Sequence, residues 1–279
     1  MLGSTLVRAL PSLCHAQVWG TVREIPDELR HLEDRLVLGV SADNMESVDR
    51  ALQKTMPDVV INCVGVIKQL KAGKSAIPCV QINALFPHLL HELCQRHGAR
   101  MIHVSTDCVF SGRKGMYAES DIPDPPDVYG QSKLLGEVVG DNALTIRTSI
   151  IGHELGGRHL SLIDWFLASS GTVKGFRKAL YSGMPTISLG RLFAKIIDEH
   201  PTLSGLYQAS SDPINKYDLL CLVQEIYRKT DVQIQPDDAF VIDRTLDSSV
   251  LRRTIGWAPP SWPDLVRDMH QYQLEWMKK

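Results

Sequence analysis

Two residues that can move a proton together stand four positions apart in the segment Val128-Tyr-Gly-Gln-Ser-Lys-Leu. On a helix, Tyr129 and Lys133 would share one face, because positions four apart are neighbours there. A free phenol has a pKa of about 10 and exchanges protons poorly near neutral pH. A nearby ammonium favours the phenolate and lowers that pKa. With the hydroxyl of Thr106 to hold a carbonyl or alcohol oxygen, these residues predict chemistry by hydride transfer.

The residues around this pair predict a strand, a stiff loop and a capped helix. The segment 100–105 reads as a short buried strand that ends in hydroxyls and a carboxylate. The proline-rich run 122–127 cannot be helical, because proline restricts both itself and the residue before it. Asp127 can cap the helix that carries Tyr129. A tyrosine and a lysine at this spacing also occur by chance on surface helices, so this context favours the catalytic interpretation.

Composition places the chain among ordinary globular proteins. Its 279 residues allow one large or two modest domains, with 44% apolar and 22% charged residues. A net charge of −2 gives no electrostatic reason to expect nucleic acid or an anionic membrane as a partner. No apolar run approaches the length of a membrane span. The histidines show no metal-ligand spacing, and the six scattered cysteines favour free thiols in a reducing cytoplasm.

Strand and helix patterns alternate through the first half, which predicts an α/β fold with a parallel sheet covered by helices. We expect a Rossmann-type doubly wound dinucleotide-binding domain over residues 1–152. A smaller α/β substrate lobe, interleaved with the first, is expected over residues 153–279. The expected strands are 17–21, 36–40, 58–65, 100–105 and 143–147. The expected helices are 3–13, 45–56, 82–97, one at Tyr129, and four near 160–170, 188–199, 216–229 and 261–277.

The start of the chain departs from this plan. A doubly wound domain opens with a strand, a glycine-rich turn and a helix whose N-terminus faces a pyrophosphate. This chain opens with the helix pattern itself, and Gly3 would be the last glycine of that turn. We therefore expect a missing first strand, a gap between the halves of the sheet and weak dinucleotide binding. A helical start with an incidental glycine is the alternative.

Motifs along essentially the whole chain resemble the extended short-chain dehydrogenase/reductases, and among them the dTDP-4-dehydrorhamnose reductase family of nucleotide-sugar reductases. The motifs are Ser105-Thr-Asp-Cys-Val-Phe-Ser-Gly, Glu119-Ser-Asp-Ile-Pro and Val128-Tyr-Gly-Gln-Ser-Lys-Leu-Leu-Gly-Glu. Cys108 stands where this family usually has an aromatic residue, which leaves the exact sugar open.

The resemblance implies a role for each matching residue. Thr106 would bind the C4 oxygen of the sugar, with Ser105 as a substitute, and Tyr129 would donate the proton. Lys133 would orient the nicotinamide ribose and lower the pKa of Tyr129. The implied cofactor-binding residues are Gly3, Arg23, Asp43, Asn62, Val64, Gly65, Asn83, Ser105, Tyr129 and Lys133. The implied substrate-binding residues are Thr106, Arg147, Ser182 and Arg191.

Charge at two positions refines these expectations. Arg23 follows the second expected strand, where an arginine suits the 2′-phosphate of NADP, so NADPH is expected and NADH is the alternative. Arg191 could pair with a diphosphate. Instead of binding a cofactor, Asn62 could cap a turn, and Asn83 could cap the N-terminal turn of a helix.

The expected function is reduction of a 4-keto nucleotide-diphosphate sugar in deoxysugar or polysaccharide biosynthesis. We expect the protein in the cytoplasm, and the sequence leaves open whether it forms a homodimer. An epimerase of the same fold is one alternative. A dehydratase is less favoured, because the Asp-Glu pair typical of that group is replaced by Asp107-Cys108. Another alternative is a catalytically idle, NADP-binding regulatory subunit, like the regulatory subunit of methionine adenosyltransferase that resembles this family. Turnover of a keto sugar nucleotide would separate these classes.

Overall fold

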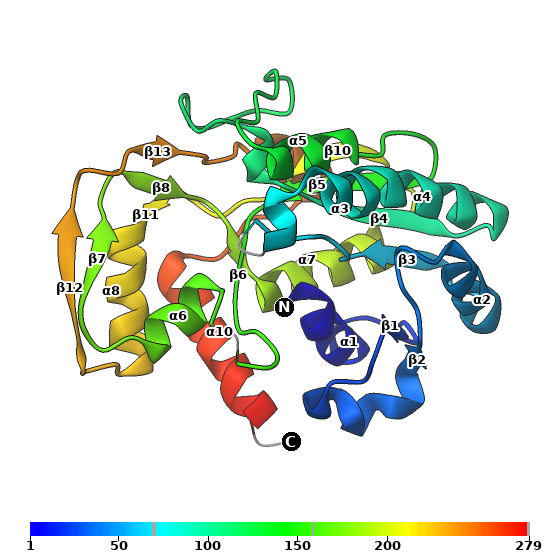
Figure 1. Cartoon of the computed structure of the whole chain (residues 1–279), viewed down its shortest axis with the longest axis horizontal. Helices are drawn as coiled ribbons and strands as arrows, with labels where there is room; N and C mark the ends of the chain where they lie inside the picture. Colours follow the sequence, from blue (N-terminus) through cyan, green and yellow to red (C-terminus); the bar gives the residue numbers. More distant parts are fainter. Residues whose placement is uncertain (69–70, 158, 278–279) are drawn as a thin grey trace.

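A parallel four-stranded sheet forms the centre of the computed structural model, which describes residues 1–68, 71–157 and 159–277. The strands lie in the order β10–β5–β4–β3 (Figure 1). They are β3 (Val59–Asn62), β4 (Arg100–Thr106), β5 (Ala143–Thr148) and β10 (Gly205–Gln208). Thr106 pairs with Thr148 at the carboxyl end of the sheet. Side chains at the ends of β3, β4 and β5 therefore meet at one edge, where doubly wound sheets place their ligands.

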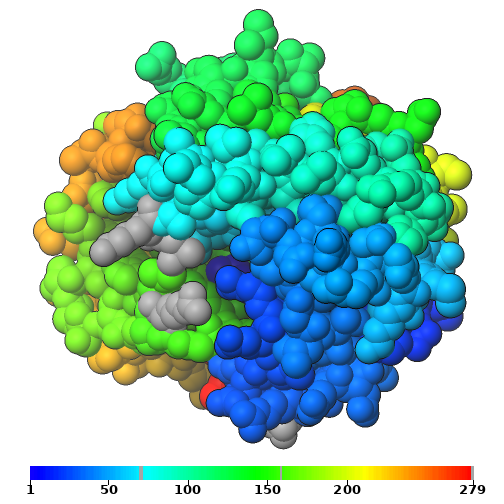
Figure 2. All heavy atoms as spheres, turned by 45° about the vertical axis from the view of Figure 1, so that its right-hand side comes forward, coloured from blue at the N-terminus to red at the C-terminus, as the bar shows by residue number. Residues whose placement is uncertain are grey.

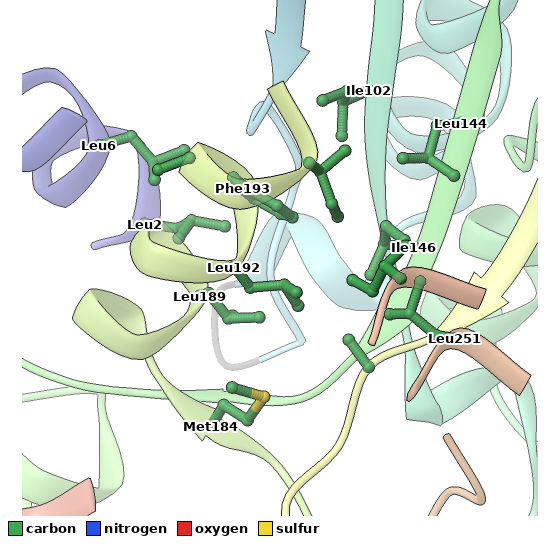
Figure 3. Packing of buried hydrophobic residues seen from close by; sticks show 14 of the residues in the cluster. Leu2, Leu6, Ile102, Leu144, Ile146, Met184, Leu189, Leu192, Phe193 and Leu251 are labelled. Atoms are coloured by element: carbon green, nitrogen blue, oxygen red, sulfur yellow. The ribbon is translucent and has the colours of Figure 1, made fainter. Parts of the chain in front are cut away.

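Helices cover both faces of this sheet, because neighbouring residues of a buried strand point to opposite faces. Met101 packs against α2 (Met45–Thr55) and α4 (Phe86–Arg96). Ile102, the next residue of β4, packs against α1 (Leu2–Leu13), α7 (Thr186–Glu199) and α9 (Ser249–Ile255) (Figure 3). This two-sided packing confirms the predicted doubly wound α/β fold.

A second parallel pair lies apart from the main sheet. It consists of β1 (Gly20–Val22) and β2 (Leu36–Leu38), joined through the 3-10 helix η1 (Asp27–Arg35). Within the described residues, neither strand pairs with the four-stranded sheet. The sheet is thus divided into two groups, as the sequence predicted. A hollow lies where the start of α1 meets the surrounding segments of both lobes (Figure 2).

The second half of the chain builds a smaller lobe and also returns to the sheet. Its core gathers apolar side chains such as Phe166, Leu219 and Leu265. Its helices are α6 (Leu162–Ala168), α8 (Lys216–Tyr227) and α10 (Trp262–Met277). Its strands are β6 (Ile150–Ile151), β7 (Gly171–Phe176), β8 (Ala179–Tyr181), β9 (Met184–Pro185), β11 (Ile214–Asn215), β12 (Val232–Asp237) and β13 (Ile242–Asp243). From this second half of the chain, β10 pairs with β5 of the main sheet and α7 packs on α1, so the two lobes are interleaved. The domain boundary at residue 152 stays a prediction.

Two predicted elements differ in the structure. The strand expected over 17–21 is confined to β1 (Gly20–Val22). The helix expected over 82–97 begins as a short α3 (Ala76–Pro78) and a π-helical stretch η3 (Cys79–Leu85) before α4. Pro87 has no amide hydrogen to offer the carbonyl of Asn83, so the regular α-helical pattern cannot run through this turn.

A glycine lets the helix that carries Tyr129 approach its neighbours closely. This helix, α5 (Val128–Leu135), ends at Gly136. A Cβ atom placed on Gly136 would lie 1.8 Å from the carbonyl oxygen of Asn83. Within α5, a Cβ atom on Gly130 would lie 2.3 Å from the carbonyl oxygen of Cys108. Both neighbours are backbone atoms, so a side chain at Gly136 must push α5 away from η3, and one at Gly130 must push it away from the segment after β4.

We therefore expect Gly136→Ala to destabilise the protein by about 3 kcal/mol, the upper part of the usual range for overpacking. Urea unfolding monitored by circular dichroism measures this change. Gly140→Ala is the matched control, because its Cβ atom would meet only the His91 ring at 3.8 Å. Equal stability of the two variants would contradict the close approach of α5.

Candidate active site

Thr106 and Tyr129 come together at the carboxyl end of β4. Thr106 is the last residue of that strand and is only 8% exposed. Asp127 caps α5 as predicted, since its Oδ1 accepts a hydrogen bond from the Gly130 amide at 2.9 Å. The capped helix places Tyr129 in its first turn, where Thr106 lies close enough to the phenol to influence its pKa. Strand, loop and capped helix therefore unite the two hydroxyl groups.

Lys133 lies one turn further along α5, with its side chain turned toward the sheet. Its Nζ donates a hydrogen bond to the carbonyl oxygen of Val104 at 2.8 Å, and the residue is 5% exposed. Burial lowers the pKa of Lys133 to about 8, although the charges of Glu137 and Cys63 oppose this shift. The ammonium is therefore close to titrating under mildly alkaline conditions.

The predicted lowering of the Tyr129 pKa is wrong for this structure. Burial raises the pKa of Tyr129, and the neighbouring Cys108 and Asp107 raise it further. Hydrogen bonding to Thr106 acts in the opposite direction but does not prevail. The phenol consequently keeps its proton over the neutral range, which is the state that a proton donor needs.

Ser105 and Arg147 belong to a buried network rather than to an open binding surface. Arg147 donates from Nε and Nη2 to the two carboxylate oxygens of Glu137, at 2.8 and 2.7 Å. Ser105 donates its hydroxyl proton to the same carboxylate at 2.7 Å. The guanidinium of Arg147 also lies over the ring of Phe110. Arg147 and Ser105 are thus both held by the Glu137 carboxylate, and their roles toward substrate and cofactor stay predictions.

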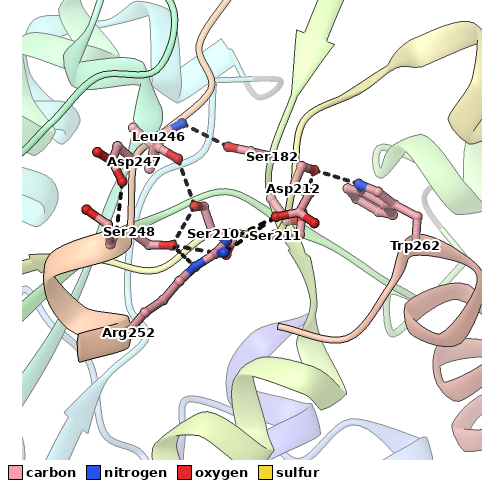
Figure 4. A network of polar contacts seen from close by, with 11 residues as sticks. Ser182, Ser210, Ser211, Asp212, Leu246, Asp247, Ser248, Arg252 and Trp262 are labelled. Atoms are coloured by element: carbon pink, nitrogen blue, oxygen red, sulfur yellow. Dashed lines mark hydrogen bonds and ion pairs between the residues drawn. The ribbon is translucent and has the colours of Figure 1, made fainter. Parts of the chain in front are cut away.

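The other two predicted substrate residues are also engaged elsewhere. The hydroxyl of Ser182 accepts a hydrogen bond from the Leu246 amide at 2.9 Å, inside the polar network that joins Ser210, Ser248 and Arg252 (Figure 4). This network ties the segment after β13 to the second lobe. The guanidinium of Arg191, on α7, pairs with Asp268 on α10 at 2.6 Å. The pairing of Arg191 with a diphosphate stays a prediction.

Several predicted cofactor residues gather where α1 meets the end of β3. A Cβ atom on Gly3 would lie 3.4 Å from Cys63, so the amino end of α1 faces the segment that follows β3. Val64 is 43% exposed there, and Gly65 is also exposed. The Asn62 side chain accepts a hydrogen bond from the Val64 amide at 3.0 Å, which makes it the cap of this turn. A helix N-terminus beside an open, side-chain-poor turn is suited to a pyrophosphate, so these residues fit a dinucleotide.

Asn83 connects this turn with α5. Its Oδ1 accepts a hydrogen bond from the Val66 amide at 2.8 Å, and its Nδ2 donates to the Val66 carbonyl at 3.1 Å. The second amide hydrogen is donated to the Ser132 hydroxyl at 3.2 Å. Both amide hydrogens are thus used in fixing the turn to the helix. The cofactor role of Asn83 stays a prediction.

Arg23 and Asp43 lie further from this group, on loops. Arg23 directly follows β1 and is exposed. Asp43 lies on the loop between β2 and α2, is exposed and accepts a hydrogen bond from the Ser41 hydroxyl. Their cofactor roles stay predictions.

Two cations outside the predicted set of site residues, Lys216 and Arg244, face the segment after Thr106. Lys216, at the start of α8, places its ammonium 3.9 Å from the centre of the Tyr181 ring. Burial lowers its pKa to about 8, while Asp107 and Cys108 favour the charged form. Arg244 donates to the Phe110 carbonyl at 3.0 Å and to the Cys108 thiol at 3.5 Å. The sequence signal was weak, because each residue follows a two-residue strand with no periodic pattern.

No cluster of three or more His, Cys, Asp or Glu side chains suited to a metal ion occurs in the part of the chain that the structure describes.

Glu137→Gln should destabilise the protein by about 3–5 kcal/mol, because it leaves the buried charge of Arg147 without its partner. The two side chains are only 6% and 5% exposed. Chemical denaturation measures the loss, and Glu46→Gln is a suitable control, since it removes only an exposed pair with Arg50. A loss of stability no larger than that of Glu46→Gln would rule out a structural role for the Glu137–Arg147 pair.

Comparison with known proteins gives a consistent family. Residues 1–271 match the family model described as RmlD substrate binding domain. A dTDP-4-dehydrorhamnose reductase of Aggregatibacter actinomycetemcomitans is 24% identical over 253 residues, which cover 82% of this chain and 86% of that protein. A probable low-salt glycan biosynthesis reductase, Agl14 of Haloferax volcanii, is 33% identical over 156 residues. That alignment spans 54% of this chain and only 50% of the Haloferax protein.

Solved structures agree on the fold. The crystal structure of dTDP-4-dehydrorhamnose reductase from Bacillus anthracis, in complex with NADP, superposes with a TM-score of 0.73 at 21% identity. The superposition covers 85% of this chain and 89% of that one. Together with the family match over nearly the whole sequence, these findings show that the chain belongs to the RmlD substrate binding domain family, within the extended short-chain dehydrogenase/reductase group.

Proposed function

We propose that this protein reduces the 4-keto group of a nucleotide-diphosphate sugar with NADPH. The observation that carries the proposal is the meeting of Thr106, Tyr129 and Lys133 at the carboxyl end of the sheet. The phenol is buried and holds its proton, and a lysine lies one turn away on the same helix. Membership of the family and the reductases among its relatives support the same reaction.

Each of the three residues has a defined task in the proposed reaction. Thr106 holds the oxygen bonded to C4, and Tyr129 transfers its phenolic proton to that oxygen as the carbonyl becomes an alcohol. Because the pKa of Tyr129 is raised, the phenol is protonated before the reaction and gives up its proton only to a strong base such as an alkoxide. Lys133 stays charged below a pH of about 8 and would hold the nicotinamide ribose.

The cofactor would be held where α1 meets the end of β3. The amino end of α1 at Gly3 and the exposed turn at Val64 and Gly65 would contact the pyrophosphate and nicotinamide portions. Arg23 would contact the 2′-phosphate that distinguishes NADPH from NADH. When bound, NADPH supplies the hydride that reduces C4.

A sugar-nucleotide substrate follows from the reductases among the relatives. In the described residues no helix is both long and apolar enough to cross a membrane. A cytoplasmic location, a homodimer and the supply of deoxysugars for surface polysaccharides are parts of the proposal that the sequence suggested.

The two alternative functions are less well supported. An epimerase must first oxidise a sugar hydroxyl, which calls for a base, and the raised pKa of Tyr129 opposes formation of the phenolate. An idle regulatory subunit would have no need for a buried tyrosine, threonine and lysine in this arrangement. Both alternatives predict no net oxidation of NADPH.

Tyr129→Phe should lower the rate of NADPH oxidation with dTDP-4-dehydrorhamnose by about 10²–10⁴-fold, because the proton donor is lost. The decrease in nicotinamide absorbance measures the rate, and fluorescence titration shows whether NADPH still binds. Tyr207→Phe, on β10, is the matched control. A wild-type rate in Tyr129→Phe would exclude the proposed proton donor, and loss of NADPH binding would assign the residue to the cofactor instead.

The value of kcat/KM should decrease as the pH rises through about 8, where Lys133 loses its positive charge. The direction follows from the charge: the ammonium is present below this pKa and absent above it, while Tyr129 remains protonated throughout. A pH profile of kcat/KM tests this, since it reports groups of the free enzyme. Lys133→Arg, which stays charged, should lose the alkaline decrease. The same decrease in Lys133→Arg would assign it to another group.

A further inference from the structure

We propose that Arg244 is a positioning residue, which holds the turn on which the spacing of Thr106 and Tyr129 depends. This inference rests on the proposed function, and it gives a task to a side chain outside the predicted set of site residues. Arg244 acts through the backbone between Cys108 and Phe110, and not by contact with the reacting atoms.

The turn is the 3-10 helix η4 (Asp107–Val109), which directly follows Thr106. The amide of Cys108 donates a hydrogen bond to the Thr106 hydroxyl oxygen at 3.1 Å. The amide of Phe110 closes the turn by donating to the Asp107 carbonyl at 3.0 Å. The place of the Thr106 hydroxyl group therefore depends on the conformation of this turn.

The same turn supports the helix that carries Tyr129. A Cβ atom on Gly130, the residue after Tyr129, would lie 2.3 Å from the carbonyl oxygen of Cys108, so α5 packs directly on this carbonyl group. A shift of Cys108 would move the Thr106 hydroxyl and remove the support of α5 at the same time. The relative position of the two hydroxyl groups thus depends on one residue, Cys108.

Arg244 contacts the turn at two places. Its Nε donates a hydrogen bond to the Phe110 carbonyl oxygen at 3.0 Å, and its Nη1 donates to the Cys108 thiol at 3.5 Å. A guanidinium group is planar and has several N–H donors in fixed directions, so one side chain can hold two acceptors at once. Arg244 therefore fixes Cys108 and the end of the turn together.

Hydrogen bonds on either side of Arg244 fix its own backbone. The Asp243 amide donates to the Gly112 carbonyl at 2.9 Å, and the Tyr117 amide donates to the Thr245 carbonyl at 2.9 Å. The Arg244 side chain passes close to Gly112, where a Cβ atom would lie 2.9 Å from its Cγ. The guanidinium is thus held in place by its surroundings, as a positioning role requires.

Other contacts join the same two segments without the Arg244 side chain. The Met116 amide donates to the Thr245 hydroxyl at 2.8 Å, and the Asp247 amide donates to the Tyr117 carbonyl at 2.8 Å. The segments should therefore stay joined when the guanidinium is removed. Its loss should loosen the turn selectively, and the cofactor site where α1 meets the end of β3 should be unaffected.

Hydrogen exchange at the Cys108 amide, measured by NMR, tests the hold on the turn without reference to activity. In Arg244→Ala this amide should exchange about tenfold faster than in the wild type, because a looser turn opens more often. Arg177→Ala is the matched control, since Arg177 pairs with Asp238 on the surface of the same lobe. The control should leave the exchange rate of Cys108 unchanged.

Steady-state kinetics tests the consequence for the reaction. In Arg244→Ala kcat should fall by about 10–10²-fold, since a small misplacement of reacting groups costs this much. The dissociation constant of NADPH should stay the same. Added guanidinium should restore much of kcat, because it can donate to the Phe110 carbonyl from the vacated space. Tetramethylammonium at the same concentration has no N–H group and should not restore it.

Arg244→Lys decides the question if Arg244→Ala does not fold. Lysine keeps the positive charge but is a single-point donor, so it cannot hold the Phe110 carbonyl and the Cys108 thiol together. We expect a kcat below that of the wild type and faster exchange at the Cys108 amide.

The possible results separate the two proposals. A wild-type exchange rate at Cys108 or a wild-type kcat in folded Arg244→Ala would overturn the positioning role, as would a wild-type kcat in Arg244→Lys. A loss of kcat that guanidinium does not restore would also overturn it, because the effect would then be one of general stability. No NADPH oxidation by the wild type would overturn the proposed function, while the exchange rate of Cys108 would still show whether Arg244 holds the turn.

Discussion

The segment that follows α5 is fastened to the sheet by the buried ion pair between Glu137 and Arg147, which also engages the Ser105 hydroxyl. The position of Tyr129 depends on this attachment, because α5 is short and lies between the pair at one end and the Asp127 cap at the other. Gly136 makes the close approach sterically feasible. A buried ion pair carries a desolvation cost, so this one is better understood as fixing the helix in register than as a source of net stability.

Burial then sets the chemistry of the site. It raises the pKa of the Tyr129 phenol and the Asp107 carboxyl, and it lowers the pKa of Lys133 and Lys216 to about 8. The Tyr129 phenol thereby keeps its proton, and the two lysines titrate at mildly alkaline pH, which suits a reaction that consumes a proton. The second lobe contributes to this environment, since Lys216 and Arg244 reach the first lobe beside Cys108.

Much of this arrangement could be predicted from local sequence. The apolar strand at 100–106, the proline-rich loop, the Asp127 cap and the spacing of Tyr129 and Lys133 each depend on nearby residues, and the structure confirms the elements they form. Local sequence did not reveal that Arg147, Ser182 and Arg191 contact Glu137, Leu246 and Asp268, because these partners come from other elements. The direction of the Tyr129 pKa shift was missed for the same reason, since burial is a property of the folded chain. The π-helical stretch η3 overlaps the start of the helix predicted over 82–97, and the helical pattern of the sequence did not reveal it.

The most direct test of the central claim is to follow deuterium from a nicotinamide-deuterated NADPH into the sugar by NMR. The chain would be incubated with a 4-keto nucleotide-diphosphate sugar in ordinary water. The account predicts deuterium bonded to C4 of the product and one oxidised cofactor for each sugar reduced. A product or substrate without deuterium at C4, with the cofactor unchanged, would contradict the assignment of this protein as a reductase.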